Sequence, residues 1–110
     1  MPLTRDYKKT IKKRVNNDPE FAKALLDEAG TLFLNGEADV ARLVLRDLVN
    51  STVGFKALAE ASNKNDKSIQ RMLSATGNPK MDNLATIFNI LREKLNLKIE
   101  VRTETIVVHQ

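Results

Sequence analysis

The chain has 110 residues, of which 42% are hydrophobic and 29% charged, and this balance is typical of a single globular domain with its own core. It has no cysteine and one histidine, so disulfides, thiol nucleophiles and metal sites built from cysteine or from several histidines are excluded. There is no glycine-rich phosphate loop and no apolar run of membrane-spanning length, so we expect neither an enzyme nor a membrane protein, and no cofactor or small-molecule substrate.

The charge is distributed unevenly along the chain. Residues 1–17 carry a net charge of +5, residues 18–51 one of −4 and residues 52–81 one of +3. The overall charge of +4 therefore belongs to two basic segments and suits a polyanionic partner. The start of the chain lacks the apolar core of a signal peptide, and we expect a cytoplasmic protein.

The first segment, residues 1–17, is a basic arm. Tyr7, Ile11 and Val15 recur at a spacing of four, which predicts either a helix that packs weakly or an arm that folds on a partner. Its Lys and Arg side chains either contact phosphates or form a solvated charged terminus.

Asp18-Pro19 predicts the start of the first core helix, because an N-cap side chain precedes a proline at the first helical position. An apolar stripe follows, and Asn35-Gly36 predicts its end. The acidic residues on the other side of this helix are Glu20, Asp27 and Glu28. They form either an ordinary solvated surface or a docking surface for a basic protein.

The helix expected at 37–50 has a narrow polar stripe, so we expect it to be largely buried as a central strut. A short helix follows it, and Ser51, Thr52 or Gly54 is expected to cap this short helix.

The stretch from Gly54 to Ser74 reads as a helix-turn-helix. Leu58 and Ala59 clamp its first helix, and Asn63-Lys64-Asn65 supplies asparagine where such a turn needs a left-handed residue. Either Ser62 or Asn65 is expected to cap the second helix. In that second helix, a polar face of Asp66, Lys67, Gln70, Arg71 and Ser74 lies opposite an apolar face of Ile69, Met72 and Leu73.

The second helix is expected to end at 76–79, with Gly77 as its C-terminal cap. Asp82 is expected to cap a last long helix that closes the core. The apolar stripe of that helix consists of Leu84, Ile87, Phe88, Leu91 and Leu95.

After Asn96 the apolar period changes to two. Leu97, Ile99 and Val101 alternate with charged residues and predict a β-strand with one buried face. The alternation slips at 103–105, which predicts a bulge or a turn into a second strand. We expect the strand to pair with a second copy of the chain and make a homodimer; the alternatives are a hairpin packed on its own domain and a frayed tail.

The polar face of the second helix predicts a DNA interface. The expected base-reading residues are Asp66, Lys67, Ser68, Gln70 and Arg71. The expected phosphate-contacting residues are Gly54, Lys56, Lys64, Asn65, Asn78 and Lys80. The alternative for Lys67 and Arg71 is that they form the solvated side of an ordinary surface helix.

Several short motifs occur along the chain in a specific order. They are Asp18-Pro19-Glu20-Phe21, Ala24-Leu25-Leu26, Leu34-Asn35-Gly36, Leu45-Arg46-Asp47-Leu48-Val49-Asn50, Gly54-Phe55, Leu58-Ala59, Lys67-Ser68-Ile69-Gln70-Arg71-Met72-Leu73, Gly77-Asn78-Pro79, Asp82-Asn83-Leu84 and Leu97-Lys98-Ile99-Glu100-Val101. With these motifs the chain resembles the addiction-module antidote proteins, type II antitoxins of the Xre/Cro-repressor helix-turn-helix class. The tail after Val101 is longer than the family pattern.

The resemblance implies a small basic toxin of the RelE/ParE type as a partner and repression of the shared operon. We therefore expect a mainly α, five-helix Cro/repressor-like domain at 18–96, with the DNA-binding motif at 54–75, the basic arm at 1–17 and a C-terminal β segment at 97–110. The expected function is that of a dimeric antitoxin that binds operator DNA. The alternatives are a stand-alone or phage-type repressor, and a protein-interaction module that has lost DNA binding, which the carboxylate of Asp66 would favour.

Overall fold

The computed structural model describes residues 19–107 of the chain. Asp18 and the basic arm at 1–17 lie outside the described residues, as do residues 108–110. The described part forms five helices, in agreement with the predicted mainly helical domain. They are α2 (Pro19–Leu34), α3 (Ala38–Ser51), α4 (Phe55–Ser62), α5 (Asp66–Met72) and α6 (Met81–Lys94).

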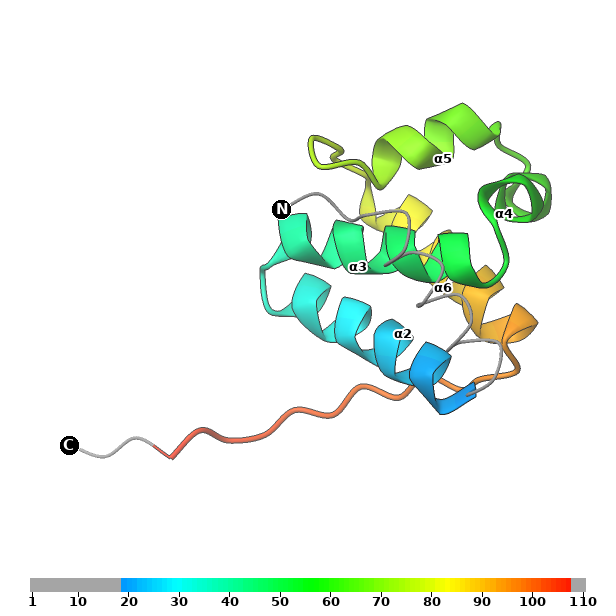
Figure 1. Cartoon of the computed structure of the whole chain (residues 1–110). Coiled ribbons are helices and arrows are strands. Elements are labelled where there is room, and N and C mark those ends of the chain that lie inside the picture. Colours follow the sequence, from blue (N-terminus) through cyan, green and yellow to red (C-terminus); the bar gives the residue numbers. More distant parts are fainter. Residues whose placement is uncertain (1–18, 108–110) are drawn as a thin grey trace, which may run out of the picture.

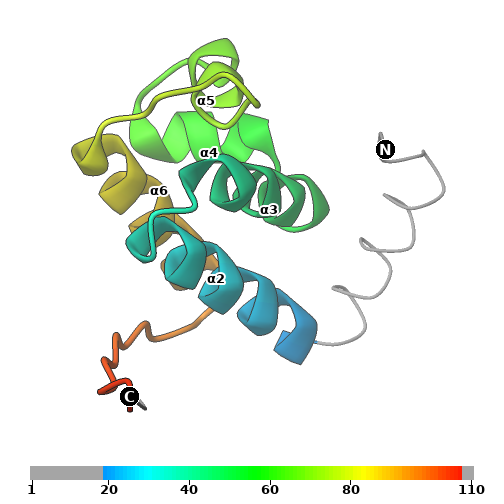
Figure 2. The ribbon, with the colours of Figure 1, turned by 90° about the vertical axis from the view of Figure 1, so that its left-hand side faces the viewer.

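The helices are arranged as an antiparallel pair with a smaller two-helix unit beside it. α2 and α3 lie side by side, α4 and α5 pack against each other beyond α3, and α6 crosses behind and contacts α4 (Figures 1 and 2). The rings of Phe33 and Phe88 meet edge to face with centroids 5.9 Å apart and join α2 to α6. One core is shared by all five helices, and its largest fully buried side chains are Leu45, Leu48, Val49, Leu58, Ile69, Leu73, Ile87 and Leu91.

Three helices end in the same way. Gly36, Asn63 and Asn96 follow α2, α4 and α6 with φ of 85°, 57° and 57°, the left-handed conformation that glycine and asparagine adopt most readily. The residue after each one donates its N–H to a carbonyl of the last helical turn. These bonds run from Glu37 to Leu32 at 2.9 Å, from Lys64 to Ala59 at 3.0 Å and from Leu97 to Arg92 at 2.7 Å. Each helix is thus closed by its own sequence, and the predicted stop at Asn35-Gly36 is confirmed.

α3 is less buried than its narrow polar stripe predicted. Val40 and Leu43 are 45% and 47% exposed, whereas Leu45 and Leu48 are fully buried. α3 packs mainly against α2 and α4, and these contacts leave the side chains of Val40 and Leu43 exposed.

Of the three residues that were expected to cap α4, Gly54 is the cap, whereas the predicted cap of α6 is wrong. The hydroxyl of Ser51 donates to the carbonyl of Asp47 at 2.7 Å and that of Thr52 to the carbonyl of Leu48 at 2.6 Å, so both close α3, and Gly54 occupies the cap position of α4. α6 begins at Met81, so Asp82 lies in its first turn and makes no cap. A carboxylate in that turn still stabilises the helix through the helix dipole.

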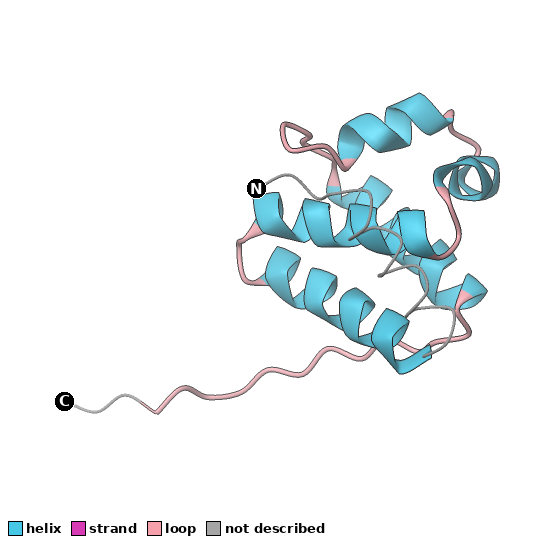
Figure 3. Cartoon of the chain, in the orientation of Figure 1, coloured by secondary structure: helices cyan, strands magenta, loops and turns pink. Residues whose placement is uncertain are grey.

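The predicted C-terminal strand is absent from the described part of the tail. Residues 97–107 are extended, but they form neither a strand nor a hairpin (Figure 3). After the bond from Leu97 to Arg92, the tail makes no backbone hydrogen bond to the described part of the chain. A strand exists only when its N–H and C=O groups pair with another strand, and the helical domain offers no edge.

None of the helices within residues 19–107 combines the length and the apolar character that a membrane span requires.

Candidate nucleic-acid interface

Residues 54–73, the α4–α5 unit, form two short helices joined by a turn. Asn63 has φ 57° and ψ 39°, and the side-chain oxygen of Asn65 accepts a hydrogen bond from the N–H of Ser68 at 2.7 Å. Asparagine suits both positions, because it tolerates the left-handed backbone and its amide oxygen caps a helix well. The predicted turn is confirmed, and Asn65 is the cap, while the Ser62 hydroxyl donates back into α4.

α5 keeps its apolar and polar residues on separate faces. Ile69 and the following Leu73 are fully buried, and Met72 packs against the core. Of the five predicted base-reading residues, Asp66, Lys67, Gln70 and Arg71 are exposed, and Ser68 is half-buried. A helix of seven residues is about 10 Å long, so these four side chains form a compact polar face.

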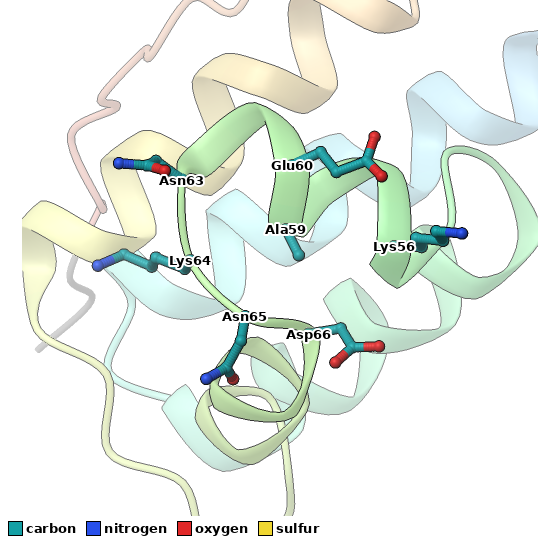
Figure 4. Close-up of a pocket in the computed structure, with 7 residues that line it drawn as sticks. All are labelled: Lys56, Ala59, Glu60, Asn63, Lys64, Asn65 and Asp66. Atoms are coloured by element: carbon teal, nitrogen blue, oxygen red, sulfur yellow. The ribbon is translucent and has the colours of Figure 1, made fainter.

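A shallow groove of about 360 Å³ lies between α4 and the start of α5 (Figure 4). It is lined by Lys56, Ala59, Glu60, Asn63, Lys64, Asn65 and Asp66. The structure therefore brings together three predicted phosphate-contacting residues, Lys56, Lys64 and Asn65, at the first end of α5. Gly54, a fourth, is half-buried at the cap of α4.

Asp66 belongs to this groove more than to the centre of the polar face. Asp66, at the start of α5, and Glu60, on α4, both line this groove (Figure 4). Asp66 is also the first residue of α5, where a negative charge stabilises a helix. The structure thus gives this carboxylate a local role in α5 that does not depend on DNA.

Asn78 and Lys80, the other two predicted phosphate contacts, are exposed in the loop between α5 and α6. This loop leaves α5 at the end opposite to α4 (Figure 1). The predicted phosphate contacts are therefore not one cluster: Lys56, Lys64 and Asn65 line the groove at the start of α5, Asn78 and Lys80 lie in the loop after it, and Gly54 is at the cap of α4.

The loop after α5 is held by Arg42, one of the residues in the narrow polar stripe of α3. The guanidinium of Arg42 donates from Nε to the carbonyl of Ser74 and from a terminal nitrogen to that of Ala75, both at 3.0 Å. A planar guanidinium is suited to such a pair of carbonyls. The sequence signal was only a polar position in a largely apolar helix, because the partners are 32 and 33 residues away.

Gly77 has a different role from the predicted one. α5 ends at Met72, and Leu73 occupies the cap position, so Gly77 is no helix cap. A Cβ at position 77 would lie 2.3 Å from the carbonyl oxygen of Met72 and 2.5 Å from that of Arg71. The loop therefore folds so tightly onto the end of α5 that no side chain fits there.

The described residues contain no group of three or more His, Cys, Asp or Glu side chains that could hold a metal ion. None of their buried side-chain polar atoms lacks a hydrogen-bond partner. What the arrangement offers is a set of exposed cations and amides on and around one short helix.

Comparisons with protein-family models, curated proteins and solved structures find no match for this chain.

Proposed function

We propose that this chain is a cytoplasmic, sequence-specific DNA-binding protein of the Cro/repressor-like helix-turn-helix class, in which α5 reads double-stranded DNA. The observation that carries the proposal is the setting of α5. Asn65 caps it, Ile69 and Leu73 anchor it in the core, and Lys67, Gln70 and Arg71 are exposed on its other side. The major groove of B-DNA is about 12 Å wide and admits such a helix.

The polar face supplies donors that suit base edges. Lys67 and Arg71 are one turn apart, and either reaches guanine O6 and N7, while Gln70 between them suits adenine. Ser68 is half-buried and Asp66 lies in the groove beside α4, so both take a smaller part in reading, with Asp66 limited to accepting from cytosine.

The two groups at the ends of α5 suit the phosphates on either side of a groove. Lys56, Lys64 and Asn65 flank its first end, and Asn78 and Lys80 flank its last end, while Gly54 offers the exposed N–H groups at the start of α4. Contacts of this kind fix the register of the protein on DNA without selecting a sequence.

A gel shift on the DNA upstream of the protein's own gene tests this proposal. Binding should weaken steeply with salt, as expected for phosphate neutralisation. Arg71→Ala should cost about 1–3 kcal/mol and relax the sequence preference, while Lys80→Ala should weaken binding to all sequences alike. Equal behaviour of the two variants would contradict base reading by Arg71. No binding by the unmodified protein would leave only a protein-interaction module.

The proposed assembly is a homodimer, because a two-fold protein reads two half-sites with two copies of α5. The segment for dimerisation is the tail, with Leu97, Ile99 and Val101 on one side of it. Ile99 and Val101 are 43% and 69% exposed, whereas Leu97 packs against the core.

The proposed biological role is that of an antitoxin, which represses its own operon and neutralises a small basic toxin of the RelE/ParE type. Support comes from the resemblance to addiction-module antidote proteins and from the exposed acidic residues Glu20, Asp27 and Glu28 on α2. Co-expression with the adjacent reading frame tests the role. Failure to co-purify or to rescue growth would leave a stand-alone or phage-type repressor.

A further inference from the structure

The tail from Leu97 to Val101 has a pattern that is complementary to itself. The side chains alternate between apolar and charged, with Lys98 and Glu100 as the charged pair. Their charged atoms are 2.9 Å apart, and the side chains are 84% and 67% exposed, so both charges stand together on the solvent side of the extended chain. When the segment is read from Val101 back to Leu97, apolar and charged residues alternate in the same way, but Glu100 and Lys98 have exchanged places.

We propose that two copies of the chain pair their tails as antiparallel strands around a two-fold axis at Ile99. This inference rests on the proposed homodimer and adds its register. Leu97 of each copy then lies opposite Val101 of the other, and the two Ile99 side chains meet at the axis. On the other face, Lys98 of each copy lies opposite Glu100 of the other, and the four charges alternate in sign.

Exposure along the tail fits this arrangement. Leu97 packs against the helical core, while Ile99 is 43% and Val101 69% exposed, so the apolar side becomes more exposed as the chain leaves the domain. In the pair, Val101 of one copy covers Leu97 of the other and continues its core. Residues 98–101 make no backbone hydrogen bond to the described part of the chain, and in the pair every second residue of the segment exchanges N–H and C=O bonds with the other copy.

Other registers are less favourable. An axis at Lys98 or at Glu100 places two like charges directly opposite each other, which is destabilising. If the two-fold axis falls between two neighbouring residues, each apolar side chain lies opposite a charged one, because apolar and charged residues alternate along the segment. An axis at Val101 keeps the charges complementary, but it places Leu97 opposite Thr105 and Ile99 opposite Thr103, so that among residues 97–105 the apolar contact is reduced to Val101 against Val101.

Charge exchange tests the pairing, with sedimentation of the full chain as the readout. K98E and E100K should each raise the dimer dissociation constant, on the order of tenfold or more, because two symmetry-related pairs change sign at once. An equimolar mixture of the two variants should form a heterodimer, since every charge again meets its opposite, and the double variant K98E/E100K should dimerise like the parent chain. K56E, which reverses an exposed charge on α4, is the matched control and should not change the dissociation constant.

Cysteine cross-linking tests the axis, because the chain has no cysteine of its own. I99C should form an intermolecular disulfide under oxidation faster than V101C, since opposite residues of an antiparallel pair are about 4.5–5.5 Å apart at Cα. Faster cross-linking by V101C would overturn the register. Three results of the sedimentation experiments would overturn the pairing. They are a parent chain that is monomeric, single variants K98E and E100K that stay dimeric, and an equimolar mixture of the two that stays monomeric. None of these measurements contains DNA, so they are independent of whether α5 binds DNA.

Discussion

The α4–α5 unit and the tail at 97–107 obtain their conformations from different sources. In the unit, Asn63 ends α4 and the side chain of Asn65 caps α5. Leu58 and Ile69 are fully buried and anchor the two helices in the core. The tail is extended and exposed, and after Leu97 it makes no backbone hydrogen bond to the described part of the chain. Local capping and burial fix a helix within one chain, whereas a strand pattern specifies a structure only together with a second strand.

The largest expected effect comes from the core beneath the unit. Leu58→Ala should lower the free energy of unfolding by about 2–5 kcal/mol, because the side chain is fully buried and its removal leaves a cavity. Urea denaturation of the variant and the parent chain measures the difference. A loss below about 1 kcal/mol would mean that α4 is not held by this core.

The next effect concerns the tight loop at the end of α5. Gly77→Ala should lower the free energy of unfolding by about 1–3 kcal/mol, because its Cβ would overlap backbone oxygens of Met72 and Arg71 that cannot move independently. Gly30→Ala is the matched control. At position 30 the nearest atom is Cε1 of Phe88 at 3.8 Å, an ordinary contact in the middle of α2, so this variant should be more stable by about 0.5–1 kcal/mol. Thermal unfolding that shifts in the same direction for both variants would contradict the contact geometry at Gly77.

A smaller effect is expected from the connection between α3 and this loop. Arg42→Ala should lower the free energy of unfolding by about 1–2 kcal/mol, because the carbonyls of Ser74 and Ala75 lose a charged donor in a half-exposed setting. Arg46→Ala, one turn further along α3, is the control and should change it by less than about 0.5 kcal/mol. Amide exchange should also be faster at residues 73–77 in the Arg42 variant. Equal exchange in both variants would contradict the role of Arg42.

The parts of the fold that sequence reasoning predicted are those with a local cause. Pro19 at the first position of α2, the stop at Asn35-Gly36 and the turn with its left-handed Asn63 each depend on residues that are close in the chain. The choice of Asn65 over Ser62 as the cap was open in the sequence, and it was decided by which side chain faces the start of α5.

The wrong or missing predictions depend on contacts between distant segments. Periodicity counts the apolar positions of α3, but it does not say how many neighbours the helix has. The helix was therefore expected to be largely buried, whereas Val40 and Leu43 are exposed. Arg42 has partners 32 and 33 residues away, and Gly77 is constrained by a backbone that folds back on it. Neither contact can be inferred from the spacing of residues along the chain.

The smallest effects should separate the two ends of the tail. Ile106→Ser should change neither the free energy of unfolding nor the dimer dissociation constant, because the side chain is 83% exposed and lies beyond the proposed paired segment. Val101→Ser should also leave the unfolding of the monomer within about 0.5 kcal/mol of the parent chain, since its side chain is 69% exposed. It should, however, weaken the dimer, because Val101 then no longer covers Leu97 of the other copy. Denaturation at low protein concentration and sedimentation over a range of concentrations measure the two quantities separately. If Ile106→Ser weakened the dimer as much as Val101→Ser, the contact between copies would extend past the slip at 103–105, and the self-complementary segment alone would not define it.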